Sequence, residues 1–364
     1  MTRLILIIAL GLLAACAPRA TLVTVPGLDP SLETRSVFVA TTRAAANGQF
    51  GAARTGRPAF LRYDMTVPPL REKGGSPFLA TKPDPQTQFL VRSRTDFQTS
   101  ASFQSALSNA LNQRNRAQRE AIIFVHGFNN TFDEGVLRIT QLAEDFDFDG
   151  VSVHYSWPSA GSPLGYAYDR DSLLIARDGL DGLISQVKAA GAQRVIIVAH
   201  SVGSMLVMET LRQRAIARPG SVAQDIDGVI LISPDIDVQL FRTQALRIGK
   251  LPQPFGIFVS RRDRVLGLSA RLTGQSNRLG NLRDGSAVAG LDVALVDVTD
   301  LSTGAGHFTA ASSPAIISLF GQAGSLNAAF KGDRAGRTGL IPGTVITVRT
   351  ATDIILSPIT GLAQ

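Results

Sequence analysis

The sequence predicts an α/β fold with a mostly parallel central sheet and helices on both faces. From residue 121 onward, short apolar runs alternate with longer segments in which apolar residues recur at helical spacing. The short runs, such as 195–198, are rich in β-branched residues without polar alternation, which is typical of strands buried on both faces of a parallel sheet. The composition, 45% hydrophobic and 18% charged, is that of a folded globular chain.

Three strands and one helix are predicted before residue 121. The strands are expected at 36–41, 59–67 and 89–91. Pro68 and Pro69 directly follow the second of these strands, which favours an edge position in the sheet. Two segments of loop-like composition are expected to be loops, 48–57 and 71–85. Apolar residues at helical spacing predict a helix across 103–111.

The rest of the chain supplies strands whose ends carry polar residues. Strands are expected at 121–125, 150–155, 195–198, 226–232, 255–260 and 291–298. Helices are expected after the first four, from about 131, 173, 205 and 238. Thr131 and Glu134 have the spacing of a capping box. Because ligands on parallel α/β sheets bind at the carboxyl ends of the strands, polar residues that follow a strand are site candidates.

Ser201 lies where the strand at 195–198 passes sharply into a helix. Ala199 and Gly203, two residues to either side, are small, as is needed where a strand and a helix approach closely. Such a turn forces its central residue into a strained backbone conformation with the side chain exposed above the sheet. Ser201 is therefore the candidate nucleophile, with simple capping of the helix as the alternative role.

Five segments together resemble a family of uncharacterised bacterial α/β-hydrolases related to esterases and lipases. They are Val-His-Gly-Phe-Asn-Asn-Thr-Phe (125–132), Tyr-Ser-Trp-Pro-Ser (155–159), Tyr-Asp-Arg-Asp-Ser (168–172), Ala-His-Ser-Val-Gly (199–203) and Ser-Pro-Asp-Ile-Asp (233–237). The resemblance covers about 36–320. It implies the α/β-hydrolase fold and a serine nucleophile, but no particular substrate, because this fold hosts many chemistries.

The resemblance also implies an oxyanion hole. In such hydrolases, a turn like His126-Gly127 places a backbone N–H where it holds the oxyanion of a tetrahedral intermediate. The implied donors in this chain are the backbone N–H groups of Phe128 and Val202. Trp157 also follows a strand, and it is expected either to line the substrate site or to pack the loop.

His307 is the expected general base of this site. The chain has 4 histidines. His126 belongs to the expected oxyanion turn, His154 lies inside a strand, and the side chain of His200 points away from the neighbouring nucleophile. His307 remains, and it comes last in the chain, as the order of serine, acid and histidine in the resembled hydrolases requires.

Two aspartates are candidates for the acid that orients this histidine. Asp263 follows the second strand after the nucleophile, which is the usual place in the resembled superfamily. Asp235 follows the next strand and is the alternative. Asp235 and Asp237 have a simpler possible role, since they precede a helix expected from residue 238 and have side chains that cap helices.

The charge and the cysteine content limit which partners and cofactors are expected. The net charge is +7, but the basic residues are scattered and no nucleic-acid-binding motif accompanies them, so no nucleic acid is expected as a partner. The single cysteine, Cys16, excludes an internal disulfide and a cysteine metal site. No metal or cofactor is expected, and the sequence does not give the oligomeric state.

The N-terminus resembles a bacterial lipoprotein signal. A short positive start precedes an apolar run from Leu4 to Ala15, which is too short to span a bilayer and ends directly before Cys16. We expect Cys16 to be acylated, which would anchor the protein to a membrane. Ala17 in place of Asp favours the outer membrane, facing the periplasm or the exterior, by resemblance to sorting signals in diderm bacteria.

The expected organisation is a signal peptide (1–15), a tether (16–34), an α/β-hydrolase domain (35–320) and an extension of undetermined structure (321–364). The leading hypothesis is a serine hydrolase, similar to carboxylesterases and lipases, that cleaves a small-molecule or lipid ester through an acyl-enzyme. An amidase or thioesterase differs only in its leaving group. A lipid-anchored binding or scaffold protein that keeps the fold without turnover is the alternative from another class.

Overall fold

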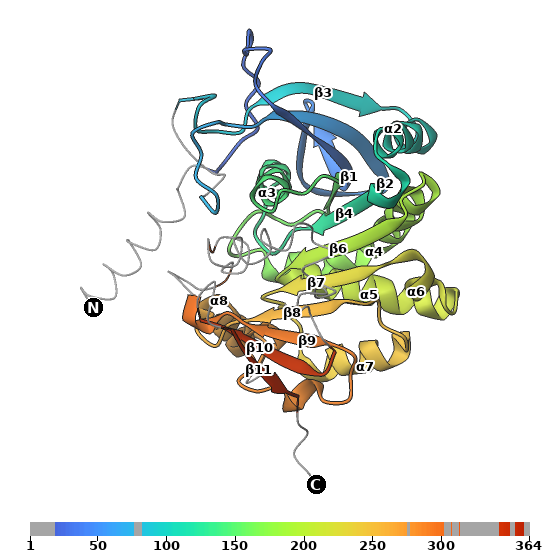
Figure 1. Cartoon of the computed structure of the whole chain (residues 1–364), viewed down its shortest axis with the longest axis vertical. Helices are drawn as coiled ribbons and strands as arrows, with labels where there is room; N and C mark the ends of the chain where they lie inside the picture. The colour runs from blue at the N-terminus through green and yellow to red at the C-terminus, as the bar shows by residue number, and fades with distance from the viewer. Residues whose placement is uncertain are drawn as a thin grey trace, which may run out of the picture.

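The structure is a computed structural model, shown in Figure 1. It describes residues 19–75, 82–274, 277–301, 307, 313, 342–349 and 354–359. The expected signal peptide and Cys16 therefore lie outside the described residues.

One sheet runs through the described chain, with the strand order β11-β10-β9-β8-β7-β6-β4-β5-β1-β2-β3 (Figure 1). The strands are β1 (Thr34–Ala46), β2 (Gln49–Thr66), β3 (Val91–Phe97), β4 (Glu120–Val125), β5 (Val151–Ser156), β6 (Arg194–His200), β7 (Gly228–Ile232), β8 (Phe255–Val259), β9 (Ala294–Asp297), β10 (Thr344–Val348) and β11 (Ile354–Pro358). Neighbours from β10 to β1 pair in parallel, while β2, β3 and β11 pair antiparallel.

Helices pack on both faces of this sheet and bury two hydrophobic clusters. The helices are α2 (Ser100–Asn112), α3 (Phe132–Asp145), α4 (Tyr166–Ala189), α5 (Val202–Ala217), α6 (Ser221–Asp225), α7 (Val238–Ile248) and α8 (Arg264–Leu272). Short 3-10 turns lie at Arg116–Gln118, Leu279–Asn281, Ser286–Val288 and Thr299–Leu301. Buried side chains of α2, α4, α5 and α7 belong to one cluster, and those of α3 belong to the other. The expected fold class is confirmed.

The N-terminal hairpin corrects two expectations from the sequence. Residues 49–57, expected within a loop, are the first part of β2, which pairs antiparallel with β1. Asn47 and Gly48 make the connecting turn, with φ of 52° and 78°, and an Asn-Gly pair is a strong hairpin signal that the loop-like composition of 48–57 obscured. β2 also pairs with β3 on its other side, so β3 and not β2 lies at this edge of the sheet.

Both flanking segments lie against the domain where the structure describes them. In the extension, β10 pairs in parallel with β9 and antiparallel with β11, which continues the sheet. At the other end, the Leu22 N–H donates to Asp133 Oδ2 at 3.0 Å, and the Val91 N–H donates to the Val23 carbonyl at 2.9 Å. Within the expected tether, Leu22 and Val23 thus contact the domain. No helix in the described ranges has the length and apolar character needed to cross a bilayer.

Candidate active site

Ser201 has a strained backbone at the junction of β6 and α5. Its φ of 54° and ψ of −126° lie in a region that residues other than glycine rarely adopt, at a cost of about 1–3 kcal/mol. Hydrogen bonds hold the residue there: its N–H donates to the Ile232 carbonyl at 3.0 Å, and its carbonyl accepts from the Asp235 N–H at 3.2 Å. Neighbouring β7 and the loop that follows it therefore fix the nucleophile position.

Two glycines let the backbone close around this serine. A Cβ on Gly203 would lie 2.3 Å from the His126 carbonyl oxygen, so only glycine lets α5 start so close to the end of β4. A Cβ on Gly127 would lie 2.9 Å from the Ser201 Cβ. The turn that follows β4 therefore rests directly against the nucleophile.

Asp263 and His307 are brought together across 44 positions of sequence. Asp263 Oδ2 lies 2.7 Å from His307 Nδ1. The other carboxylate oxygen accepts the Leu266 N–H at 3.0 Å, since Asp263 is also the N-cap of α8. This helix N-terminus holds the buried carboxylate in one orientation, so the imidazole that binds it is oriented as well.

His307 lies over the nucleophile turn. The His307 carbonyl is 3.3 Å from His200 Nε2, and the two rings are 4.8 Å apart between centroids. Burial, and secondly the nearby His307, hold the pKa of His200 well below its ordinary value, so His200 stays neutral. No hydrogen bond of the Ser201 hydroxyl is found among the described residues, and the hydrogen bond between a catalytic serine and its histidine commonly tightens only when substrate binds.

Asp235, the alternative acid, is bound elsewhere. Its carboxylate forms an ion pair with Arg278 Nε at 2.7 Å and accepts the Ser269 hydroxyl at 2.8 Å. The Tyr166 hydroxyl lies 3.4 Å from the same carboxylate and 2.9 Å from Arg278 Nη2. The structure therefore assigns Asp235 to a buried cluster beside the site and brings no histidine to it within the described residues.

The expected oxyanion donors flank Ser201. As the first residue of α5, Val202 has a backbone N–H without a partner in the helix ladder. Phe128 follows Gly127, and its ring meets that of Tyr166 edge-on at 5.6 Å. Val202 directly follows the nucleophile, and Phe128 follows Gly127, whose backbone lies against Ser201.

His126 and Trp157 support this turn from behind. Trp157 is fully buried, its ring stacks on His126 at 4.9 Å, and its indole N–H donates to the His126 carbonyl at 2.8 Å. Trp157 therefore packs the loop and does not line the substrate site. His126 is also fully buried, and burial lowers its pKa far below the ordinary value, so it stays neutral.

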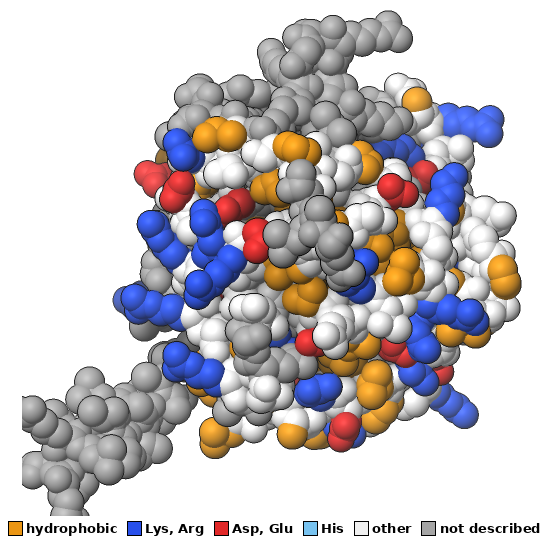
Figure 2. All heavy atoms as spheres, turned by 90° about the horizontal axis from the view of Figure 1, so that it is seen from below, with side chains coloured by type: hydrophobic (Ala, Val, Ile, Leu, Met, Phe, Trp, Pro, Cys, Tyr) orange, Lys and Arg blue, Asp and Glu red, His pale blue; other side chains and the backbone are white. Residues whose placement is uncertain are grey.

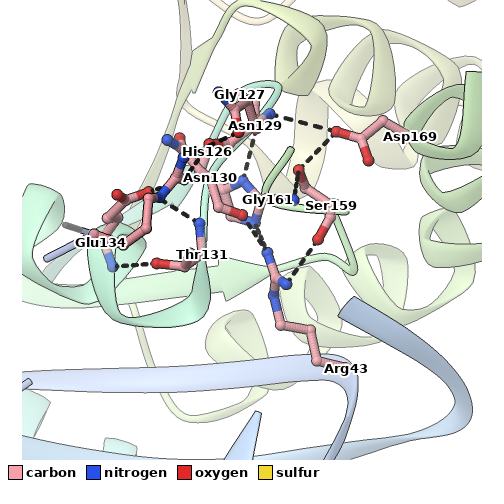
Figure 3. Close-up of polar contacts among 11 residues, drawn as sticks. Arg43, His126, Gly127, Asn129, Asn130, Thr131, Glu134, Ser159, Gly161 and Asp169 are labelled. Atoms are coloured by element: carbon pink, nitrogen blue, oxygen red, sulfur yellow. Dashed lines mark hydrogen bonds and ion pairs between the residues drawn. The ribbon is translucent and has the colours of Figure 1, made fainter. Parts of the chain in front are cut away.

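Arg43, a buried residue of β1, joins the two loops that border the site (Figure 3). Its guanidinium donates to the carbonyls of Asn130 at 2.8 Å and Ser159 at 2.9 Å, and to the Ser156 hydroxyl at 3.0 Å. Burial lowers the pKa of Arg43 to about 10, so the group remains charged at neutral pH. One cation thus holds the oxyanion loop and the Trp157 loop together.

Asp169 of α4 completes this framework. It accepts the Ser159 hydroxyl at 2.6 Å, the Ala160 N–H at 2.6 Å and, more weakly, the Asn129 N–H at 3.4 Å. Burial raises the pKa of this carboxyl, and the three hydrogen bonds oppose the shift. In the described ranges, no group of three His, Cys, Asp or Glu side chains is placed to hold a metal ion.

Sequence reasoning did not single out Arg43, Arg278 or Tyr166. Arg43 falls next to an expected strand, and Arg278 and Tyr166 lie in loop-like sequence, so nothing local marks them as buried. For Asp169, the segment Tyr-Asp-Arg-Asp-Ser belonged to the resemblance and was the available signal. These residues are buried by contacts with partners that are distant in sequence, and no short sequence motif indicates such contacts.

The described geometry agrees with what a family comparison finds. Residues 99–323 match the family described as "Alpha/beta hydrolase of unknown function (DUF900)". The chain belongs to this family. Its match spans Ser201, Asp263 and His307, and it leaves the activity of the family open.

Individual relatives are distant. The uncharacterized protein alr1448 of Nostoc sp. is 28% identical over 126 residues, which cover 28% of this chain and 33% of that relative. Lipase B of Aspergillus fumigatus aligns with 15% identity and a TM-score of 0.27 over 39% of this chain and 37% of its own. The chain thus spans about a third of the length of either protein.

A thermostable esterase from Pseudomonas putida ECU1011 aligns more broadly, over 82% of this chain and 83% of its own, with 13% identity and a TM-score of 0.39. At such low scores, neither structural likeness carries an argument about the site. The α/β-hydrolase assignment therefore depends on the family match and the sheet.

Proposed function

We propose that this protein is a serine hydrolase that cleaves a carboxylic ester through an acyl-enzyme. The observation that carries the proposal is the 2.7 Å contact between Asp263 and His307, whose ring lies 4.8 Å from that of His200, the residue directly before a serine with the strained backbone of a nucleophile turn. A binding protein has no need to orient an imidazole next to such a turn. Without His307, no base would take the proton from the Ser201 hydroxyl, which is a weak nucleophile by itself.

In the proposed reaction, His307 Nε2 takes the proton from Ser201 Oγ as this oxygen attacks the ester carbonyl carbon. The N–H groups of Phe128 and Val202 bind the oxyanion, each contributing about 3 kcal/mol to transition-state stabilisation. The imidazolium, stabilised by Asp263, then protonates the departing alkoxide as the C–O bond breaks. In the second half of the reaction, His307 takes a proton from water as the water oxygen attacks the acyl carbonyl carbon. The imidazolium then returns the proton to Ser201 Oγ as the acyl–serine bond breaks.

The nucleophile is tested by labelling with a fluorophosphonate probe. Purified wild-type protein should be labelled, whereas Ser201→Ala should not be. Ser204→Ala is the matched control, because Ser204 is a buried serine of the same helix whose hydroxyl is bonded to the Ala199 carbonyl. Equal labelling of the Ser201→Ala protein would overturn the assignment.

Turnover separates the hydrolase from the scaffold alternative. Hydrolysis of a short p-nitrophenyl ester that disappears in both Ser201→Ala and His307→Ala supports the hydrolase. Absence of labelling and of turnover in folded wild-type protein favours the scaffold. Matched amide and thioester substrates then identify the leaving group, which the described geometry does not select.

We further propose that Cys16 is acylated and attaches the protein to a membrane. The support is the sequence of the N-terminus, with an apolar run that ends directly before this cysteine. Cys16→Ser should release the protein from the membrane fraction or leave an unprocessed precursor. A wild-type protein found wholly in the soluble cytoplasmic fraction would contradict this localisation.

A further inference from the structure

Large apolar side chains are exposed at the edge of the domain that carries the candidate site. Leu164, in the loop before α4, is 95% exposed. Leu268 and Val265 lie on α8, the helix that Asp263 caps, and are 58% and 37% exposed. The three residues therefore sit on the elements that build the site, where hydrophobic exposure has no role in folding.

These apolar side chains are accompanied by cations. Arg261, Arg262 and Arg264 surround Asp263 in sequence and are all exposed. Arg261 also forms an ion pair with Asp297 at 3.2 Å, and the three arginines together keep this segment basic. On the face seen in Figure 2, basic side chains lie on both the left and the right, with hydrophobic side chains between them. We call these three arginines, together with Leu164, Val265 and Leu268, the active-site rim.

Direct contacts connect the two parts of the rim to the oxyanion turn. The Tyr166 hydroxyl, two residues after Leu164, lies 3.1 Å from the Ser269 hydroxyl, one residue after Leu268. The Tyr166 ring packs against Phe128 at 5.6 Å. The exposed leucines therefore lie on segments that contact each other and, through Tyr166, the turn that carries Phe128.

The N-terminal segment joins the domain at the same edge. Arg19 donates to the Asn129 carbonyl at 2.5 Å and forms an ion pair with Glu134 at 2.6 Å. Asn129 is the residue after Phe128. Arg19 is only three positions after Cys16, and three residues of chain reach at most about 11 Å. An acyl chain on Cys16 would thus hold the oxyanion turn close to the bilayer.

We propose that the active-site rim docks on an anionic lipid bilayer, so that the ester substrate is taken from the membrane surface. Exposed leucines enter the boundary between headgroups and acyl chains, and arginines beside them attract anionic headgroups. The docked N-terminal segment sets this orientation. The orientation stands without the hydrolase assignment, whereas the substrate class rests on it.

Orientation is tested in full-length protein reconstituted into vesicles of phosphatidylcholine and phosphatidylglycerol. Leu164→Cys and Leu246→Cys are each labelled with a polarity-sensitive fluorophore, and lipids that carry nitroxides on their acyl chains serve as quenchers. Leu246 is the matched control, because it is 65% exposed but lies near the C-terminal end of α7, at the opposite edge of the sheet. The parent protein, treated in the same way, gives the background from Cys16.

The label at position 164 should be quenched by the lipid nitroxides, and the label at 246 should not. Equal quenching, or stronger quenching at 246, would overturn the orientation. Replacing Arg261, Arg262 and Arg264 together by Gln should weaken quenching at 164. Quenching at 164 that is indifferent to these replacements and to the phosphatidylglycerol content would remove the anionic-lipid part of the proposal.

The substrate class is tested with two esters, one water-soluble and one borne on the vesicle surface. The double variant Leu164→Ser, Leu268→Ser should lower the rate on the vesicle-borne ester about tenfold and leave the rate on the soluble ester unchanged, because lost burial of the leucines weakens only membrane docking. Equal loss on both esters would contradict lipid docking and indicate damage to the site. Normal quenching without hydrolysis of either ester would refute the proposed function alone.

Discussion

At the scale of single residues, Asp263 has two tasks that one substitution separates. It caps α8 through Leu266 and binds the imidazole of His307. Asparagine caps helices about as well as aspartate, but its amide favours the wrong imidazole tautomer. We therefore predict that Asp263→Asn lowers kcat on a p-nitrophenyl ester by about 10⁴-fold while the Tm changes little.

The comparison variant for this prediction is Asp235→Asn, which alters the other candidate acid. Asp235 is paired with Arg278 and makes no contact with His307. Its substitution should therefore act on stability first and cost far less in kcat. The reverse ranking of the two variants would transfer the orienting role to Asp235.

Arg278 gives a second prediction at this scale. Its guanidinium and the Asp235 carboxylate are each about 95% buried, with side-chain exposures of 5% and 4%. Arg278→Met leaves a buried carboxylate without its counter-ion, so the free energy of unfolding should fall by about 3–5 kcal/mol in a denaturant titration.

The matched control for Arg278→Met is the double variant with Asp235→Leu, which removes both charges. Much of the lost stability should return in this protein, because no unpaired charge remains buried. If the double variant is less stable than Arg278→Met alone, the pair is not the source of the effect.

Much of the candidate site was predictable because its chemistry follows strand ends. Ser201, Asp263 and His307 were chosen from sequence order and strand position, and the structure places Asp263 against His307. The supporting residues, such as Arg43, were not predictable. Arg43 acts through carbonyls of Asn130 and Ser159, about a hundred positions away, and backbone carbonyls carry no mark in a sequence.

At the scale of elements, the approach of α5 to β4 sets the geometry of the nucleophile. Gly203→Ala would place a methyl group 2.3 Å from the backbone oxygen of His126, which cannot move without displacing the oxyanion turn. We predict a loss of stability of more than about 2 kcal/mol and a fall in kcat, measured by denaturant titration and ester hydrolysis.

Gly182→Ala is the control for this helix substitution. Gly182 lies within α4, and a Cβ there meets nothing within 4 Å. Alanine should raise the free energy of unfolding by about 0.5–1 kcal/mol, because it restricts the unfolded chain and favours helix. Similar effects at both glycines would show that steric closeness to β4 is not what Gly203 provides.

Sequence periodicity located the elements of the central sheet but missed its margins. The strands β4 to β9 are buried on both faces, so their apolar runs are unbroken and easily recognised. The first part of β2 is half exposed and rich in Arg and Gly, so its composition resembles a loop. The strands β10 and β11 are short, and they form by pairing along the edge of the existing sheet, β10 with β9 and β11 with β10.

At the scale of the whole molecule, three buried histidines couple folding to pH. His126, His154 and His200 are inaccessible enough that burial lowers the pKa of each, to about 3 for His154. In the unfolded chain, each has an ordinary pKa of about 6.5. As the pH falls below this value, the three histidines are protonated in the unfolded chain but stay neutral in the folded protein.

The sign of the effect follows directly. The stability associated with these neutral histidines is fully present above about pH 6.5 and is lost as the pH falls toward the folded-state pKa values. Well inside that window, three sites titrating only in the unfolded state make the free energy of unfolding fall by up to about 4 kcal/mol per pH unit. Denaturant titrations between pH 7.5 and about 5 measure this slope.

His154→Asn isolates one of the three sites. Asparagine can keep the hydrogen bond that His154 Nδ1 makes to the Phe124 carbonyl at 3.1 Å, but it takes up no proton. The slope below pH 6.5 should therefore decrease by up to about 1.4 kcal/mol per pH unit, whatever the variant costs in absolute stability. A slope equal to that of wild type would show that His154 is protonated alike in both states, and that its burial does not couple to folding.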